Sequence, residues 1–229
     1  TLSSSSAASD VYKRQAQEAP MYTPAHFSLT DSDSLHGLIR SHPLGTLVTQ
    51  ANGVLDANHL PFLLDADPGE MGTLSAHVAR ANPLWQQCRD GAEVLVVFRG
   101  AEGYISPSWY PSKHETHRLV PTWNYEAVHV HGQISIHDDE RFVRGLVGRL
   151  TRVHEASQAQ PWKMSDSPRE FIDGMLQAIV GLQIRITRLE GKAKLSQNRQ
   201  ARDLEGAIGA LRERGQEPLA GAMDAAPRI

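Results

Sequence analysis

The alternation of apolar and polar residues along the chain predicts mostly β-strands. Residues 44–50 and 54–65 flank Asn52-Gly53, a pair typical of tight hairpins because both residues tolerate the positive φ of a type I′ turn. The apolar run at 93–100 is typical of a central strand, and 182–189 alternates with period two. With a strand at 71–78 and the hairpin described below, we expect six to eight strands, mostly joined by hairpins.

Amphipathic helices are predicted between and after these strands. The capping side chain of Asp31 precedes a short helix that ends at Pro43, and acidic residues at 138–140 begin another helix through 155. Further helical patterns occupy 81–90, 168–179 and 198–215. Together the elements predict a mainly β fold with peripheral α-helices, arranged as a small antiparallel barrel.

The most informative single stretch is Tyr104–Gly132, which has the pattern of a long hairpin. It holds two of the four tryptophans and four of the eleven histidines, and its strands are joined by the polar segment Tyr110–Pro121. A loop of that length is typical of a lid or binding loop. Its aromatic residues could bind a flat ligand. Alternatively, they are ordinary core or interface residues, as aromatic side chains often are.

Residues 1–20 differ from the rest of the chain. They form a Ser/Ala-rich stretch without apolar periodicity, and part of it resembles translated sequencing-adapter sequence. It lacks the basic start and apolar run of a secretory signal. We therefore expect a non-native or disordered segment, with Met21 as the true start, and a single domain over 21–229.

Composition narrows the class of protein. The formal net charge is −3, and no apolar run approaches the roughly 20 residues that span a bilayer. The single cysteine, Cys88, permits no internal disulfide and is typical of a reducing compartment. These features predict a soluble cytoplasmic protein without membrane partners.

The histidines do not form a recognised metal motif. His129 and His131 are expected to project from one face of a strand, but no Cys, Asp or Glu lies at a spacing that completes a ligand set. The segment His114–His117 differs from the helical HExxH motif because its histidines are three positions apart in a loop. We therefore expect no metal site.

Three other segments carry candidate ligand-binding groups. Asn58, His59 and Leu60 precede a proline inside a strand pattern, a place where backbone groups become free for a ligand. Ser75 and His77 share one strand face, and Arg80 opens the next helix, so hydroxyl, imidazole and guanidinium could surround a phosphate. Further positive charge is available in 194–199.

Six motifs of the chain resemble, in order, those of the PaiB-type family of FMN-binding negative transcriptional regulators. They are MYTPAHF at 21–27, HLPF at 59–62, HVARANP at 77–83, GYISPSWY at 103–110, VPTWNYEAVHVHG at 120–132 and GKAKLSQNR at 191–199. The resemblance implies an FMN-binding split β-barrel related to pyridoxamine-phosphate oxidases, and a homodimer with FMN at the subunit interface. The loop with His114, His117 and Arg118 is more basic than expected for the family.

The resemblance also implies roles for particular residues. Ser75, His77 and Arg80 would lie on the phosphate-binding strand, and Asn58, His59 and Leu60 along the isoalloxazine. Trp123 and Asn124 would face the flavin, and Lys194 and Gln197 would complete the pocket.

Three functions stay open at this point. The family resemblance implies a negative transcriptional regulator with a DNA partner, although the mixed charges of 199–214 indicate a solvated helix face. A flavin-dependent oxidoreductase acting on a small planar substrate with NAD(P)H is the alternative, since the cofactor itself would supply the chemistry. A haem-handling split barrel, with His129 or His131 on the iron, is a third.

Overall fold

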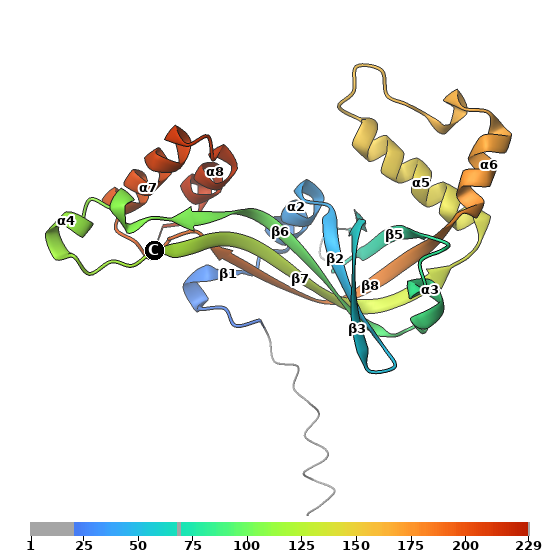
Figure 1. The fold of residues 1–229 in the computed structure, drawn as a ribbon, viewed down its shortest axis with the longest axis horizontal. Coiled ribbons are helices and arrows are strands. Elements are labelled where there is room, and N and C mark those ends of the chain that lie inside the picture. Colours follow the sequence, from blue (N-terminus) through green and yellow to red (C-terminus); the bar gives the residue numbers. More distant parts are fainter. Residues whose placement is uncertain (1–20, 68–69, 229) are drawn as a thin grey trace, which may run out of the picture.

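The computed structural model describes residues 21–67 and 70–228, and Figure 1 shows their arrangement. The expectation for residues 1–20 therefore lies outside the described residues. Eight strands form one sheet in the order β3-β2-β6-β7-β8-β5-β4, with β1 paired to β8. The strands are β1 (Ser28–Leu29), β2 (Leu44–Ala51), β3 (Val54–Pro61), β4 (Leu63–Asp65), β5 (Thr73–Ala79), β6 (Glu93–Ile105), β7 (Thr122–His137) and β8 (Ile179–Lys194).

The sheet is antiparallel throughout and curls into a split barrel. Its hydrogen-bonded order is open, and the chain passes from β3 at one end to β4 at the other through Phe62, whose backbone N–H donates to the Pro43 carbonyl at 2.8 Å. The proline in the predicted strand 54–65 explains this break, because Pro61 has no N–H for a ladder. The predicted mainly β, split-barrel fold is confirmed.

Helices lie around the barrel and at the ends of its long strands (Figure 1). The α-helices are α2 (Ser32–Ser41), α3 (Leu84–Gln87), α4 (Lys113–Thr116), α5 (Glu140–Glu155), α6 (Arg169–Gln177), α7 (Ala201–Glu213) and α8 (Glu217–Ala225). The 3₁₀ turns are η1 (Ala25–Phe27), η2 (Pro107–Trp109) and η3 (Met164–Asp166). No helix of the described ranges 21–67 and 70–228 is long and apolar enough to span a bilayer.

The local signals that predicted these elements have clear structural counterparts. Asn52 and Gly53 take φ values of 53° and 78° in the β2–β3 turn. The Asp31 carboxylate accepts the Ser34 N–H at the start of α2, and the Asp139 carboxylate accepts the Phe142 N–H at the start of α5. These caps satisfy N–H groups that have no partner within a helix.

Three predicted details were wrong. The first strand of the expected hairpin, over 104–109, ends at Ile105, because Pro107 begins η2 instead of continuing the ladder. The hairpin loop contains the short helix α4, and a final helix, α8, follows the stretch expected to end the fold.

Two main apolar cores hold the molecule together. The larger fills the barrel with side chains of β2 and β5–β8, including Leu47, Phe98 and Val130, none of which has exposed surface. The smaller lies at the far end of the long strands, where Ile105 and Tyr110 pack with Leu211 of α7. Strands β6, β7 and β8 connect these two regions, so residues at their opposite ends lie far apart (Figure 1).

Candidate functional site

The predicted residues of β3 lie at the edge of the barrel. The Asn58 side chain accepts a hydrogen bond from the amide of Asn82 at 2.7 Å and donates to Asp56 at 2.9 Å. His59 is exposed, and its Nδ1 lies 3.0 Å from the Thr46 hydroxyl on β2. Leu60 packs against the barrel core. Sequence analysis did not foresee Asn82, which joins β3 to the segment after β5.

Ser75 and His77 project from the same face of β5, as predicted, and α5 covers that face. Phe142 of α5 stacks on His137 and lies over Gly181, the β8 partner of His77. The Ser75 hydroxyl and the His77 Nδ1 are both buried, and neither has a hydrogen-bond partner among the described residues. Burial also lowers the pKa of His77, because a charged imidazole is poorly solvated there. These two polar atoms are therefore buried without a hydrogen-bond partner in residues 21–67 and 70–228.

Arg80 lies just after β5 and is held by several groups. Its guanidinium donates two hydrogen bonds to the Asp138 carboxylate, at 2.9 and 2.5 Å, and one to the Gln177 carbonyl at 2.6 Å. The hydrogen bonds with Asp138 are the main reason that the pKa of Arg80 is raised. The Trp85 ring lies beneath the guanidinium, at 5.7 Å. Even so, 41% of the Arg80 side chain is exposed, so its positive charge remains accessible from solvent.

Trp123 and Asn124 are neighbours on β7, but they point to opposite faces of the sheet. Trp123 is 51% exposed and lies beside Tyr104 of β6, which is 47% exposed. Asn124 is 1% exposed, and its amide donates to the Ser196 hydroxyl at 2.9 Å. Of these two residues, only Trp123 can therefore present its side chain to a ligand on the exposed face of the sheet.

Lys194 and Gln197 also differ in that the first lies beside the exposed aromatic pair and the second is buried. The Lys194 ammonium donates to the Trp123 carbonyl at 2.8 Å, which places it beside the exposed aromatic pair. Partial burial lowers the pKa of Lys194. Gln197 is buried, where its amide donates to the Ala193 carbonyl and its oxygen accepts the Leu195 N–H, so its side chain supports the turn after β8.

The segment Tyr110–Pro121 is packed onto α7. Ser112 donates from its backbone N–H and its hydroxyl to the buried Asp203 carboxylate, at 3.0 and 2.6 Å. Glu115 forms a two-hydrogen-bond ion pair with Arg202 of α7. This docking differs from the free lid expected from the length of the loop.

The predicted residues thus fall into two groups. The barrel group contains Asn58, His59, Leu60, Ser75, His77 and Arg80, and the strand-end group contains Trp123, Asn124, Lys194 and Gln197. Arg80 is bound to Asp138, directly after the end of β7, whereas Trp123 lies at its beginning. At roughly 3.3 Å per residue, about 45 Å of strand separates Trp123 from His137. One chain does not bring the two groups together.

Members of both groups nevertheless face the same side of the sheet. His59 is in register with Thr46, Thr46 with Val97, and Val97 with His129. Residues directly opposite one another in paired strands project to one face, and so do residues two apart along a strand. His59 and Trp123 therefore share the outer face of the long strands.

The outer face also carries residues that sequence analysis had not grouped. Glu190 of β8 lies opposite His129, and Tyr104 lies opposite Trp123. Burial is the main cause that lowers the pKa of His129. Strand pairing over large sequence separations creates these contacts, so spacing along the chain could not reveal them.

Comparison with known proteins agrees with the fold. A family model described as "Putative FMN-binding domain" matches residues 21–188. Protease synthase and sporulation protein PAI 2 of Bacillus subtilis is 31% identical over 183 residues, covering 80% of this chain and 85% of that protein. The uncharacterized protein AN0679 of Emericella nidulans is 32% identical over 230 residues, covering 85% and 92% of the two chains.

A solved structure shows the same fold at low sequence identity. The FAD and heme binding protein from Mycobacterium smegmatis superposes with a TM-score of 0.53 and 19% identity, covering 73% of each chain. With the family model and the Bacillus relative, this establishes the fold and the family. The chain belongs to the PaiB-type family of FMN-binding split-barrel proteins, and FMN is its cofactor.

Proposed function

We propose that two copies of this chain form a homodimer and hold FMN between them. The observation that carries the proposal is that Arg80 of the barrel group and Trp123 of the strand-end group, both partly exposed, lie at opposite ends of β7. In a dimer with two-fold symmetry, a contact of residue i with residue j occurs twice, because j also contacts i. The barrel group of one copy would then meet the strand-end group of the other, which gives two equivalent sites.

The residues of these groups fit the chemistry of FMN. A flavin ring needs a flat, apolar wall, which the half-exposed Tyr104 and Trp123 offer on adjacent strands. A phosphate needs a cation and hydrogen-bond donors, and Arg80 provides a partly exposed guanidinium. Bound FMN would supply electron or hydride transfer, while the protein binds and orients it.

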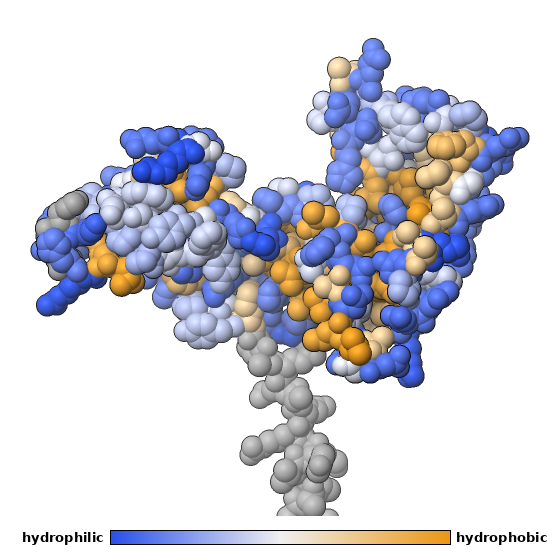
Figure 2. Space-filling view, in the orientation of Figure 1, coloured by the Kyte–Doolittle hydropathy of each residue, from blue (hydrophilic) through white to orange (hydrophobic). Residues whose placement is uncertain are grey.

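Apolar exposure on the barrel end also favours association. Val54 and Leu55, at the β2–β3 hairpin, are 68% and 69% exposed. Figure 2 shows apolar surface there, below the centre of the barrel. Burying such side chains against a second copy would remove apolar area from water.

The dimer proposal is tested by measuring mass and flavin content together. Purified protein should be yellow, should have the mass of two chains by light scattering, and should bind one FMN per chain. A monomer that binds FMN tightly would refute the shared site. A colourless protein that does not take up added FMN would refute the proposal that these residues bind FMN.

For the role of the FMN-bound dimer, we propose negative regulation of transcription. The support is the family, together with a relative whose name links it to protease synthesis and sporulation. Binding to a promoter fragment should weaken steeply as salt is raised, because displaced counterions dominate the affinity of proteins for DNA. Absence of salt-dependent retention on any fragment upstream of the gene would contradict this role.

A second function is favoured by the charges of the C-terminal segment. Arg202, Arg212, Arg214 and Arg228 each lie within 4.0 Å of a carboxylate, so their charge is locally compensated. Such a surface attracts DNA weakly. It favours an FMN-dependent oxidoreductase that acts on a small planar substrate. Anaerobic bleaching of bound FMN by NADH or NADPH tests this function, and unchanged absorption with both would contradict it.

A cytoplasmic location remains part of the proposal, because the single cysteine, Cys88, is typical of a reducing compartment.

A further inference from the structure

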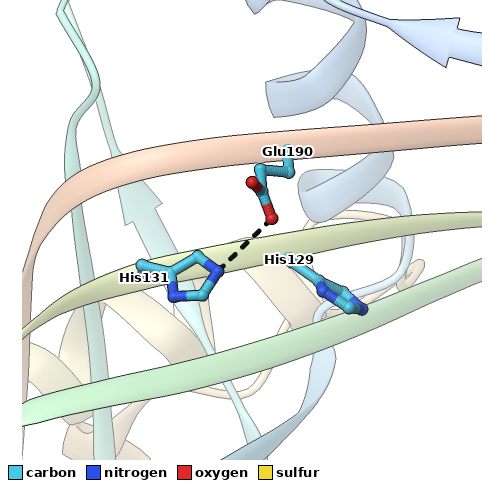
Figure 3. Close-up of side chains that lie close together, drawn as sticks. All are labelled: His129, His131 and Glu190. Atoms are coloured by element: carbon cyan, nitrogen blue, oxygen red, sulfur yellow. Dashed lines mark ion pairs between the residues drawn. The ribbon is translucent and has the colours of Figure 1, made fainter. Parts of the chain in front are cut away.

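Two histidines and a glutamate converge on the outer face of the sheet. His129 and His131 project from β7, and Glu190 comes from the neighbouring strand β8, in register with His129. Figure 3 shows the Glu190 carboxylate directed toward His131, with the His129 ring nearby. One ligand atom from each residue lies within 4.8 Å of the others, and the His131 Nε2 is 3.4 Å from a Glu190 oxygen.

The cluster is partly enclosed by its neighbours. The side chains of His131 and Glu190 are 23% and 15% exposed. The Met21 backbone N–H donates to Glu190 Oε2 at 3.2 Å, so the first described residues lie against this part of the face. The His131 Nε2 is buried and has no hydrogen-bond partner in the described part of the chain, although it faces the carboxylate.

Arg188 fixes the orientation of the carboxylate. Its guanidinium is paired with Glu190 Oε1, whereas Oε2 faces His131. A carboxylate held in this way offers one oxygen to a third group. The arginine also compensates the negative charge when that third group is absent, which explains how the cluster is tolerated in a half-buried position.

The ligand types and spacing match those of a transition-metal site. Zinc takes imidazole nitrogens and carboxylate oxygens at about 2.0–2.2 Å, and two ligands of a tetrahedron with such bonds lie roughly 3.4 Å apart. The His131–Glu190 separation has this value already. Two histidines and one carboxylate with open positions also bind Fe²⁺, whereas Mg²⁺ and Ca²⁺ prefer oxygen ligands alone.

We propose that His129, His131 and Glu190 bind a divalent transition metal of the Zn²⁺ type, with at least one position left for water or another ligand. The sequence alone predicted no metal site, because no third ligand lies close to these histidines in the chain. The third ligand instead comes from β8, through the β7–β8 pairing. The site involves none of the ten residues assigned to FMN.

The experiment uses the full chain, freed of metal by dialysis against a chelator. Co²⁺ is added as a spectroscopic probe, and Zn²⁺ affinity is measured by competition with a chromogenic chelator. We expect one equivalent of metal per chain and a visible cobalt absorption band that Zn²⁺ abolishes. Failure of either ion to bind at stoichiometric concentration would overturn the proposal.

Substitutions separate this site from adventitious binding. His131→Ala and Glu190→Gln should each lower Zn²⁺ affinity by at least about tenfold, since even the groups that orient metal ligands contribute that much. Glu190→Gln has nearly the native shape and keeps the test valid if the alanine variant folds poorly. His154→Ala, at an exposed position on α5, should leave affinity unchanged. Equal affinity in all variants, or loss only in His154→Ala, would overturn the assignment. Because FMN binding is measured independently by absorption, failure of the metal site would leave the proposed function intact.

Discussion

Adjacent residues of β7 should give opposite results when replaced by alanine. Trp123 is 51% exposed on the outer face, whereas Asn124 is 1% exposed and donates a hydrogen bond to Ser196. Both belong to the family motif, so resemblance alone assigns both to the flavin. Their geometry instead assigns Trp123 to ligand binding and Asn124 to the stability of the strand-end core.

For Asn124→Ala, the lost interaction is a buried hydrogen bond. Removing it leaves the Ser196 hydroxyl, in a residue only 4% exposed, without the amide that donates to it. Such losses cost about 1–3 kcal/mol of unfolding free energy. In a chain of this size, each kcal/mol lowers Tm by roughly 2–4 °C, so we expect a clear decrease, with FMN affinity per folded chain little changed.

For Trp123→Ala, the free chain loses little, because half of the ring is already in water. Stacking of a planar ring on an aromatic side chain is worth about 1–3 kcal/mol by analogy with bases on such platforms. FMN affinity should therefore fall by roughly 5- to 150-fold. Thermal unfolding without FMN and fluorescence titration with FMN measure the two effects separately. Loss of FMN binding in Asn124→Ala at unchanged Tm, with no loss in Trp123→Ala, would refute this reasoning.

Three further predictions test other parts of the structure. Arg80→Ala should weaken FMN binding, because it removes the cation proposed to bind the phosphate. Asp138→Ala breaks the same ion pair and should leave FMN affinity equal or higher. Equal weakening in both variants would mean that Arg80 acts only through the structural ion pair. Burial raises the pKa of Glu126 in the folded protein, so the stability of the folded state falls as pH rises through that raised pKa. In urea titrations, Glu126→Gln should be more stable than the native protein at pH 7 and no more stable below about pH 4. A stability difference independent of pH would contradict this. Gly206→Ala would place a Cβ 2.3 Å from the Trp109 carbonyl, so α7 must move away and Tm should fall; an unchanged Tm would mean that this contact is looser than described.

Local sequence signals accounted for much of the fold. Asn52-Gly53 needs positive φ, Asp31 and Asp139 cap helices, and Pro61 ends β3. Each of these effects depends on a few neighbouring residues, so it is visible in the sequence. Alternation similarly indicated the long strands, although it could not show that Pro107 would begin a 3₁₀ turn.

The candidate site depended on contacts between distant segments, and these were harder to foresee. Arg80 was expected to be free for a phosphate, but Asp138 binds it because the ends of β5 and β7 lie near each other. Glu190 joins His129 and His131 only through the β7–β8 pairing. Motif resemblance placed Trp123 and Asn124 in one pocket, since it carries no information on which strand face each residue occupies.

The central claim, that each FMN site is built from two copies, is tested most directly by complementation. Arg80→Ala alters the barrel group and Trp123→Ala alters the strand-end group, so each variant alone should bind FMN weakly at both sites of its dimer. Co-expression of the two should yield mixed dimers in which one of two sites is intact, which restores about a quarter of all sites at random pairing. We predict recovery of tight FMN binding to that level in the mixture. If mixed dimers form and no tight binding returns, the account of a shared site is contradicted.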